Sequence, residues 1–120
     1  MQRIILIAED SPVTSSVLKV KLENEGFSVD AVSSGYALLG YLKDKEEPAV
    51  IVLDLVLPGK TGIELLSTVK NKWPGTKIFI FSAHPEYETK LYVFEDYICG
   101  FFAKTKGVDR LIKAIKKEFK

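Results

Sequence analysis

The chain has 120 residues, 47% of them hydrophobic, and 17 Lys and Arg against 16 Asp and Glu give it a net charge of +1. This length fits one domain, residues 1–120, and the balanced charge gives no reason to expect nucleic acid binding, which usually needs a basic excess. No apolar run approaches the roughly 20 residues that span a bilayer, and the N-terminal run is too short for a signal peptide. A single cysteine, Cys99, excludes an internal disulfide. We expect a cytoplasmic domain that makes no membrane contact.

Five short apolar runs recur along the chain, separated by segments of helical period. The runs are Ile4–Ala8, Phe27–Val32, Val50–Leu53, Ile78–Phe81 and Phe101–Ala103. The first, third and fourth runs are continuously apolar, as strands that are buried on both faces should be. The second run alternates between apolar and polar residues, which favours the edge of a sheet.

Helical patterns follow the first two runs. The first helix is expected to begin at Ser11, a good capping residue, and Pro12, which fits the first helical position, and Gly26 suits its C-terminal cap. Three valines recur at helical spacing and predict its apolar face: Val13, Val17 and Val20. The second helix is marked by three leucines: Leu38, Leu39 and Leu42.

Three more helical patterns follow in the second half. Thr61 and Glu64 fit a capping box, and the third helix continues to Pro74 with apolar residues Leu66, Val69 and Trp73. Pro85 opens a fourth helix, with an apolar stripe of Tyr87, Leu91, Phe94 and Ile98. Tyr92 falls off that stripe, which makes it a candidate contact for a partner. The last helix has the most regular stripe: Val108, Leu111, Ile112, Ile115 and Phe119.

The elements therefore alternate strictly between strand and helix, five of each. This order predicts an α/β fold, (βα)5, in which helices cover both faces of a parallel sheet. There is no internal repeat and no linker composition that would divide the chain.

Polar side chains follow four of the five predicted strands. Glu9 and Asp10 follow the first strand, Asp54 the third, Ser82 the fourth and Lys104 the fifth. Ligands of open parallel sheets bind beyond the carboxyl ends of the strands, so we expect these side chains to converge there. Three neighbouring acids need a cation, and Mg²⁺ favours such oxygen ligands together with phosphate. A hydroxyl and an ammonium suit phosphoryl oxygens, with a carboxylate as the nucleophile.

This ordered set resembles the receiver domain of response regulators, the chemotaxis-regulator-like (CheY-like) superfamily of two-component signalling. The matching residues are Glu9-Asp10, Asp54 within VLDLVLPGKTG, Ser82-Ala83 and Lys104 within GFFAK. The resemblance covers the whole chain. It implies a flavodoxin-like, doubly wound sandwich with a five-stranded parallel sheet in the order 2-1-3-4-5.

The resemblance also implies roles for the acids. Asp54 would accept a phosphoryl group from a histidine kinase or a phosphotransfer protein. Asp10 would bind Mg²⁺ directly, Glu9 would bind it through water, and the backbone carbonyl of Val56 would complete the protein ligands. The chain would then be no enzyme in the usual sense, but an acceptor that assists its own phosphorylation and dephosphorylation.

The remaining roles concern switching. Lys104 would pair with a phosphoryl oxygen, and Ser82 would turn inward to hydrogen-bond the same group. Phe101 stands at the position of the switch aromatic and would fill the space that Ser82 leaves. The face formed by the fourth helix, fifth strand and fifth helix would change shape and bind a protein partner.

Other interpretations stay open. A degenerate receiver would keep the fold and bind partners without phosphorylation, although the complete residue set argues against it. A phosphatase with an aspartyl-phosphate intermediate would usually carry a second acid where Val56 stands. His84, the only histidine, would block or orient the hydrolytic water, or have no chemical role. Cys99 is expected to be a small core residue.

Thr105 departs from the family pattern, in which a proline follows the lysine and the bond between them is typically cis. A cis bond costs about 0.5–1 kcal/mol before proline but about 3–4 kcal/mol before another residue. We therefore predict a trans Lys104–Thr105 bond, with Lys104 reaching the site through its flexible stem. Gly107 would give the rebuilt loop its freedom.

Overall fold

The computed structural model describes residues 3–119, apart from the side chains of Tyr92 and Val93, so the predicted partner contact of Tyr92 lies outside the described residues. The strands are β1 (Ile4–Ala8), β2 (Ser28–Val32), β3 (Val50–Leu53), β4 (Val56–Leu57), β5 (Lys60–Thr61), β6 (Lys77–Ser82) and β7 (Ile98–Ala103). The helices are α1 (Pro12–Asn24), α2 (Gly35–Asp44), α3 (Gly62–Lys72), α4 (Tyr87–Lys90) and α5 (Asp109–Lys117), with two 3₁₀ segments, η1 (Tyr92–Tyr97) and η2 (Lys104–Lys106).

Five strands form one parallel sheet in the order β2-β1-β3-β6-β7. This is the predicted order 2-1-3-4-5, because β6 and β7 are the fourth and fifth strands of the main sheet. Strands β4 and β5 form a separate antiparallel hairpin directly after β3. The predicted edge position of the second strand is confirmed. The strand order reverses between β1 and β3, so their carboxyl ends open onto a crevice.

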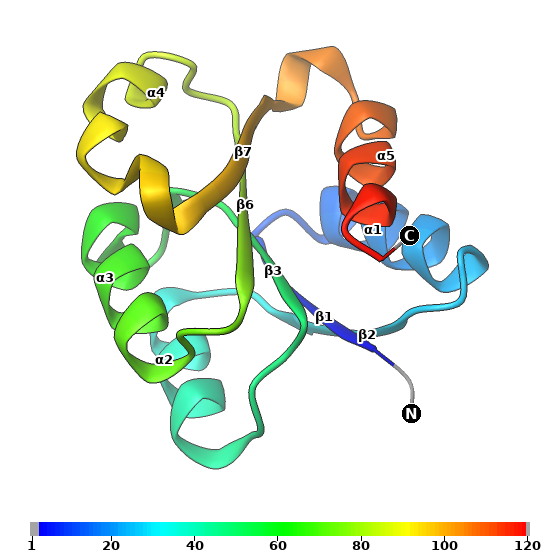
Figure 1. Ribbon diagram of the computed structural model, residues 1–120, viewed down its shortest axis with the longest axis horizontal. Helices are drawn as coiled ribbons and strands as arrows, with labels where there is room; N and C mark the ends of the chain where they lie inside the picture. The colour runs from blue at the N-terminus through cyan, green and yellow to red at the C-terminus, as the bar shows by residue number, and fades with distance from the viewer. Residues whose placement is uncertain (1–2, 120) are drawn as a thin grey trace.

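Helices cover both faces of the sheet (Figure 1): α1 and α5 pack on one face, and α2, α3 and α4 lie on the other. Each face has its own apolar core. The core under α1 and α5 includes Ile5, Leu18, Phe79 and Leu111, and the opposite core includes Leu6, Leu38 and Leu66. None of the helices within residues 3–119 has the length and apolarity needed to cross a membrane.

The predicted capping residues hold the helix ends. Ser11 Oγ accepts the Thr14 N–H at 3.3 Å, and Pro12 occupies the first turn of α1. Gly26 has a φ of 95° just beyond the end of α1, a conformation that glycine adopts without strain. Thr61 Oγ1 accepts the Glu64 N–H at 3.3 Å and starts α3 as expected.

The predicted apolar face of α1 is wrong. Val13, Val17 and Val20 are 74%, 39% and 56% exposed, whereas Leu18 and Leu22 are fully buried. The two sets lie on nearly opposite sides of the helix, and burying the larger leucines removes more apolar surface from water. The valines therefore form an exposed apolar stripe that begins three residues after Asp10.

The predicted fourth helix and the burial of Cys99 also need correction. The segment after Pro85 forms only the short α4 and the 3₁₀ segment η1, and Ile98 belongs to β7. Strand β7 therefore begins three residues before the predicted Phe101. Cys99 is exposed, because the pairing with β6 shifts between Ile98 and Gly100 and leaves Cys99 without a partner at the edge of the sheet.

Candidate functional site

Asp54 lies at the carboxyl end of β3, where the following hairpin fixes its side chain. The Val56 N–H donates to Asp54 Oδ1 at 3.0 Å, and the Asp54 N–H donates to the Ala8 carbonyl at 3.0 Å. The chain can fold back this tightly because Gly62 has no side chain. A Cβ on Gly62 would come within 2.5 Å of the Leu55 Cα. The hairpin thus positions the Asp54 carboxylate and the neighbouring Val56 backbone together.

Glu9 and Asp10 follow β1, the neighbour of β3 in the sheet, and their environments differ. Glu9 is 3% exposed, and its Oε2 accepts the Ser11 N–H at 3.0 Å. Asp10 is exposed to solvent. One carboxylate oxygen from each of Glu9, Asp10 and Asp54 lies within 4.8 Å of the others. The sequence prediction that these three acids converge is therefore confirmed.

Lys104 reaches into the same acidic cluster from the end of β7. Its Nζ lies 2.8 Å from Asp54 Oδ2 and 2.6 Å from Glu9 Oε1. No peptide bond in residues 3–119 is cis, so the trans Lys104–Thr105 bond is confirmed. The loop uses the predicted freedom of Gly107, which has a φ of 80°. The contact with Glu9 was not predicted, because no spacing in the sequence indicates which acid a lysine will choose.

Burial sets the electrostatics of Glu9 and Lys104. Burial raises the pKa of Glu9, and the negative charge of Asp54 adds to this, although Lys104 and the Ser11 N–H act against it. Burial would lower the pKa of Lys104, but its ion pairs with Asp54 and Glu9 outweigh burial and raise it. Ionised Glu9 is thus held at a net energetic cost, while charged Lys104 is stabilised.

The raised pKa of Glu9 predicts how metal-free stability depends on pH. Between the ordinary pKa of about 4.5 and the raised folded value, the folded state keeps a proton that the unfolded state has released. Stability should therefore fall as pH rises through this window and level off above it. Glu9→Gln should remove the fall and leave the protein more stable at neutral pH, as measured by urea unfolding in EDTA. An unchanged pH profile in Glu9→Gln would contradict this account.

The acidic cluster fits Mg²⁺, although no ion is part of the structure. Glu9 Oε1 is buried, and among the described residues its close partner is Lys104 Nζ at 2.6 Å, which Asp54 shares. Mg²⁺ prefers oxygen ligands, so it would give this oxygen a positively charged partner and would offset the repulsion among the three carboxylates. The backbone carbonyl of Val56, the remaining predicted Mg²⁺ ligand, belongs to the same loop as Asp54.

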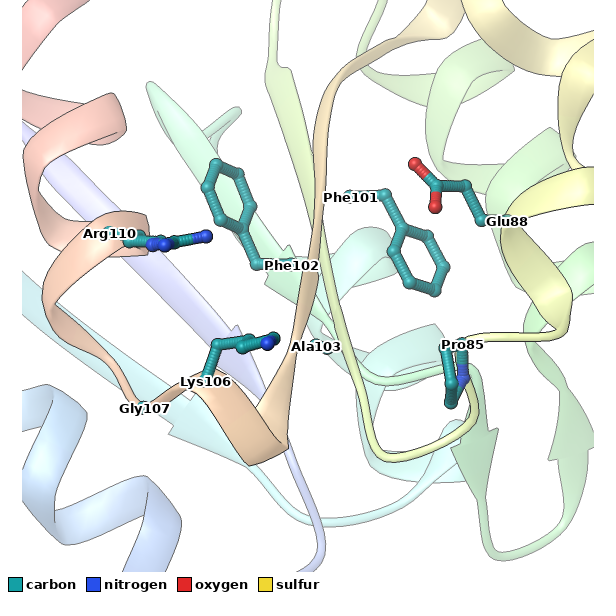
Figure 2. Close-up of a pocket in the computed structure, with 8 residues that line it drawn as sticks. All are labelled: Pro85, Glu88, Phe101, Phe102, Ala103, Lys106, Gly107 and Arg110. Atoms are coloured by element: carbon teal, nitrogen blue, oxygen red, sulfur yellow. The ribbon is translucent and has the colours of Figure 1, made fainter.

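Ser82 ends β6, His84 follows it, and Phe101 lies in β7. Ser82 is fully buried, and its Oγ accepts the His84 N–H at 3.0 Å. The half-exposed His84 ring places Nδ1 3.3 Å from Glu86 Oε1, a contact that was not predicted. Phe101 is partly buried and points to the α4 side of β7 (Figure 2).

The sequence matches the response regulator receiver domain family over residues 5–116. Two curated relatives are the cell cycle transcriptional regulator CtrA of Caulobacter vibrioides, 30% identical, and the probable transcriptional regulatory protein TcrX of Mycobacterium tuberculosis, 23% identical. Each match covers 94% of this chain and 50% of the relative. The chain thus spans about half the length of these relatives.

Solved structures show the same fold. The response regulator TrrA of Thermotoga maritima, in complex with Mg²⁺-BeF, is 26% identical with a TM-score of 0.82, covering 98% of both chains. A CheY-like receiver domain protein of Methanospirillum hungatei is 22% identical with a TM-score of 0.88, covering 98% of this chain and 94% of the other. The family match spans nearly the whole chain and agrees with the acidic site at the carboxyl ends of β1 and β3. The chain belongs to the response regulator receiver domain family of two-component signalling.

Proposed function

We propose that Asp54 accepts a phosphoryl group from a histidine kinase or a phosphotransfer protein with Mg²⁺, and that phosphorylation switches a protein-binding face. The observation that carries this proposal is the setting of Asp54. Its carboxylate lies between the Lys104 ammonium at 2.8 Å and two further acids that can hold a dication. The exposed valines of α1, which begin three residues after Asp10, offer a protein donor an apolar surface.

The transfer exchanges one bond for another at phosphorus. An Asp54 oxygen forms the new P–O bond as the P–N bond to the donor imidazole breaks, and the released imidazole nitrogen takes up a proton. The Val56 N–H orients the attacking carboxylate, and Lys104 can donate to a phosphoryl oxygen. Asp10, Asp54, the Val56 carbonyl and, through water, Glu9 would hold Mg²⁺, which would supply further positive charge to these oxygens.

The switch begins at Ser82 in this proposal. Its Oγ accepts the His84 N–H, while its own hydroxyl proton remains able to donate to a phosphoryl oxygen. Drawing Ser82 toward Asp54 opens space beside β7 that Phe101 can occupy. The α4–β7–α5 face then changes its packing because the phosphoryl group favours one arrangement over the other.

Two other functions fit the observations less well. A degenerate receiver would need no acceptor chemistry, yet Glu9, Asp10, Asp54 and Lys104 all lie in one cluster.

We also propose that the chain turns over no external substrate. Val56 stands where an aspartyl-phosphate phosphatase usually has its second acid. Exposing the chain to small phosphate esters and measuring free phosphate tests this point, and sustained turnover would contradict it.

The acceptor proposal is tested with acetyl phosphate or phosphoramidate. Intact-mass spectrometry should show one phosphoryl group per chain with Mg²⁺ and none with EDTA. Borohydride reduction converts an aspartyl phosphate to homoserine, so peptide mapping should find homoserine at position 54. A known receiver treated in parallel shows that the donor is active. No modification, or a modification at another residue, would refute the proposal.

Mg²⁺ affinity should separate the two acids after β1. Asp10→Asn should weaken Mg²⁺ binding more than Glu9→Gln, because a direct ligand loses more than one that acts through water. The pairing of Glu9 with Lys104 supports a smaller loss for Glu9→Gln, since the negative charge of Glu9 is already partly neutralised. We expect a loss of about tenfold or more for Asp10→Asn and a smaller loss for Glu9→Gln, measured by calorimetry. Equal losses would remove the distinction between the two acids.

His84 should control how long the phosphoryl group survives. The valine side chain at position 56 cannot hydrogen-bond a water, whereas the imidazole of His84, two residues beyond Ser82, can crowd or orient one. His84→Ala should therefore change the dephosphorylation rate by about two- to tenfold while phosphorylation still occurs. The decay of the intact-mass peak after donor removal measures the rate. Glu86→Gln is the control, since it keeps the ring and neutralises the carboxylate 3.3 Å from Nδ1, and an unchanged rate in His84→Ala would mean that the ring has no role.

A further inference from the structure

Strand β7 forms one edge of the sheet, and its outer side is unpaired. It hydrogen-bonds only with β6, and no other backbone hydrogen bond reaches residues 98–103 within the described part of the chain. All six residues keep some exposure, whereas the four residues of the central strand β3 are buried. Figure 2 looks onto this edge of the sheet, with β7 in front of β6.

The composition of β7 is unusual for an exposed edge. Edge strands commonly carry a charge or a proline that discourages pairing with another strand. The sequence of β7 is ICGFFA, with neither, whereas the opposite edge strand β2, SVDAV, carries Asp30. Strand β7 thus keeps a pairing surface that the other edge of the sheet lacks.

Two cavities of about 240 Å³ each lie along β7, and they share Glu88 and Phe101. Figure 2 shows that β7 separates two walls: Phe101 points toward Glu88 on the α4 side, and Phe102 points toward Arg110 on the α5 side. Glu95 also lines the α4 wall, and Lys106 lies with Arg110 at the other wall. One wall is therefore acidic and the other is basic.

We propose that the free edge of β7 binds an extended protein segment as a sixth strand, and that this segment alternates between acidic and basic side chains. Successive side chains of a strand point to opposite faces of a sheet. In the added strand, one set of side chains would face Glu88 and Glu95, and the other would face Lys106 and Arg110. Backbone pairing supplies affinity and the two walls supply specificity. The proposal rests on the switching face proposed above and identifies its partner chemistry.

Charge also favours such a segment over a second copy of the chain. Antiparallel pairing of two β7 strands about a two-fold axis continues the sheet and keeps each face on the same side. The acidic α4 wall of one copy would then meet the acidic α4 wall of the other, and the basic walls would meet likewise. Like charges placed opposite one another disfavour that pairing.

The test uses two short peptides of the same composition. In one peptide, glutamate and lysine alternate around a central valine pair, so all acids share one face of a strand. In the other peptide, the same residues occur as Glu-Glu and Lys-Lys pairs, so each face of the strand carries both acidic and basic side chains. Binding to the full chain is followed by fluorescence anisotropy, and amide exchange of residues 98–103 is followed by NMR. The alternating peptide should bind more tightly and protect amides of β7.

Charge reversals of the walls complete the experiment. Glu88→Lys and Arg110→Glu should each weaken binding of the alternating peptide about fivefold, the equivalent of one exposed ion pair. A variant with all four wall charges reversed, Glu88→Lys, Glu95→Lys, Lys106→Glu and Arg110→Glu, should restore binding, because the peptide can then turn its two faces around. Equal binding of both peptides, or no protection of β7, would overturn the inference. Self-association of the free chain that either reversal alters would assign this edge to a second copy instead, and would also overturn it.

The same measurements separate this inference from the proposed function. Binding is tested with unphosphorylated chain, wild type and Asp54→Asn, so it does not depend on acceptor chemistry. Normal phosphorylation of Asp54 without peptide binding would overturn only the sixth-strand inference. Peptide binding by a wild-type chain that acetyl phosphate does not label would refute only the acceptor proposal.

Discussion

Replacing Asp54 by Asn should abolish phosphorylation by acetyl phosphate, reducing the labelled fraction from most of the chains to none detectable. The amide keeps the size of the carboxylate but has no negative charge to attack phosphorus, and it is a poor ligand for Mg²⁺. The Val56 N–H can still donate to the Asn carbonyl oxygen, so the loop after β3 should keep its shape. The loss would therefore report chemistry rather than unfolding.

The matched control is Glu64→Gln, which neutralises an exposed acid in the first turn of α3. This variant should be labelled as fully as the wild type, and circular dichroism should show that both variants are folded. Intact-mass spectrometry with and without Mg²⁺ provides the measurement. Persistent Mg²⁺-dependent labelling of Asp54→Asn would show that another residue is the acceptor.

Replacing Lys104 by Met should cost about 2–3 kcal/mol of metal-free stability, because it removes the only cation paired with two buried carboxylates within the described residues. The effect is at the lower end for a broken buried pair, since Lys104 is 20% exposed and Glu9 can take up a proton. Mg²⁺ should recover part of the loss, because a ligand that binds only the folded state stabilises it.

Urea unfolding in EDTA and in Mg²⁺ measures both effects. Lys106→Met is the control, since it removes an exposed lysine from the same 3₁₀ segment and should change stability by no more than about 0.5 kcal/mol. A Lys104→Met variant as stable as the wild type in EDTA would show that the ammonium does not offset repulsion between Glu9 and Asp54.

The sheet and the acidic cluster could be predicted because their signals are local and redundant. Runs such as Val50–Leu53 are short and continuously apolar, as strands buried on both faces are, and the residue after each strand lies at the carboxyl edge. Asp54, Glu9 and Lys104 were thus brought together by topology alone. Their pairing was not predictable, since it depends on side-chain paths across the crevice.

The failures occurred where one pattern fits two structures. Helix α1 carries valines and leucines on opposite sides, and spacing alone cannot say which side faces the sheet. The stripe ending at Ile98 has helical period, yet Ile98 gains more from pairing with β6 than from extending a helix. Cys99 is exposed because the pairing of β6 and β7 is irregular at this point. Nothing in the residue type of Cys99 predicts such an irregularity.

The shortness of α4 has a consequence for the energy of rearrangement. Its four residues include none that is buried, and the 3₁₀ turns of η1 have poorer hydrogen-bond geometry than an α-helix. Helix α5, by contrast, is anchored by Leu111, Ile112 and Ile115. Among the described side chains of residues 87–97, only Leu91 is buried, so opening this segment breaks fewer buried contacts than opening α5 and places it toward the low end of the local unfolding free energies. Under the proposed function, a phosphoryl group on Asp54 would then need only a modest preference between two packings to move this segment, while the rest of the sandwich would keep its form.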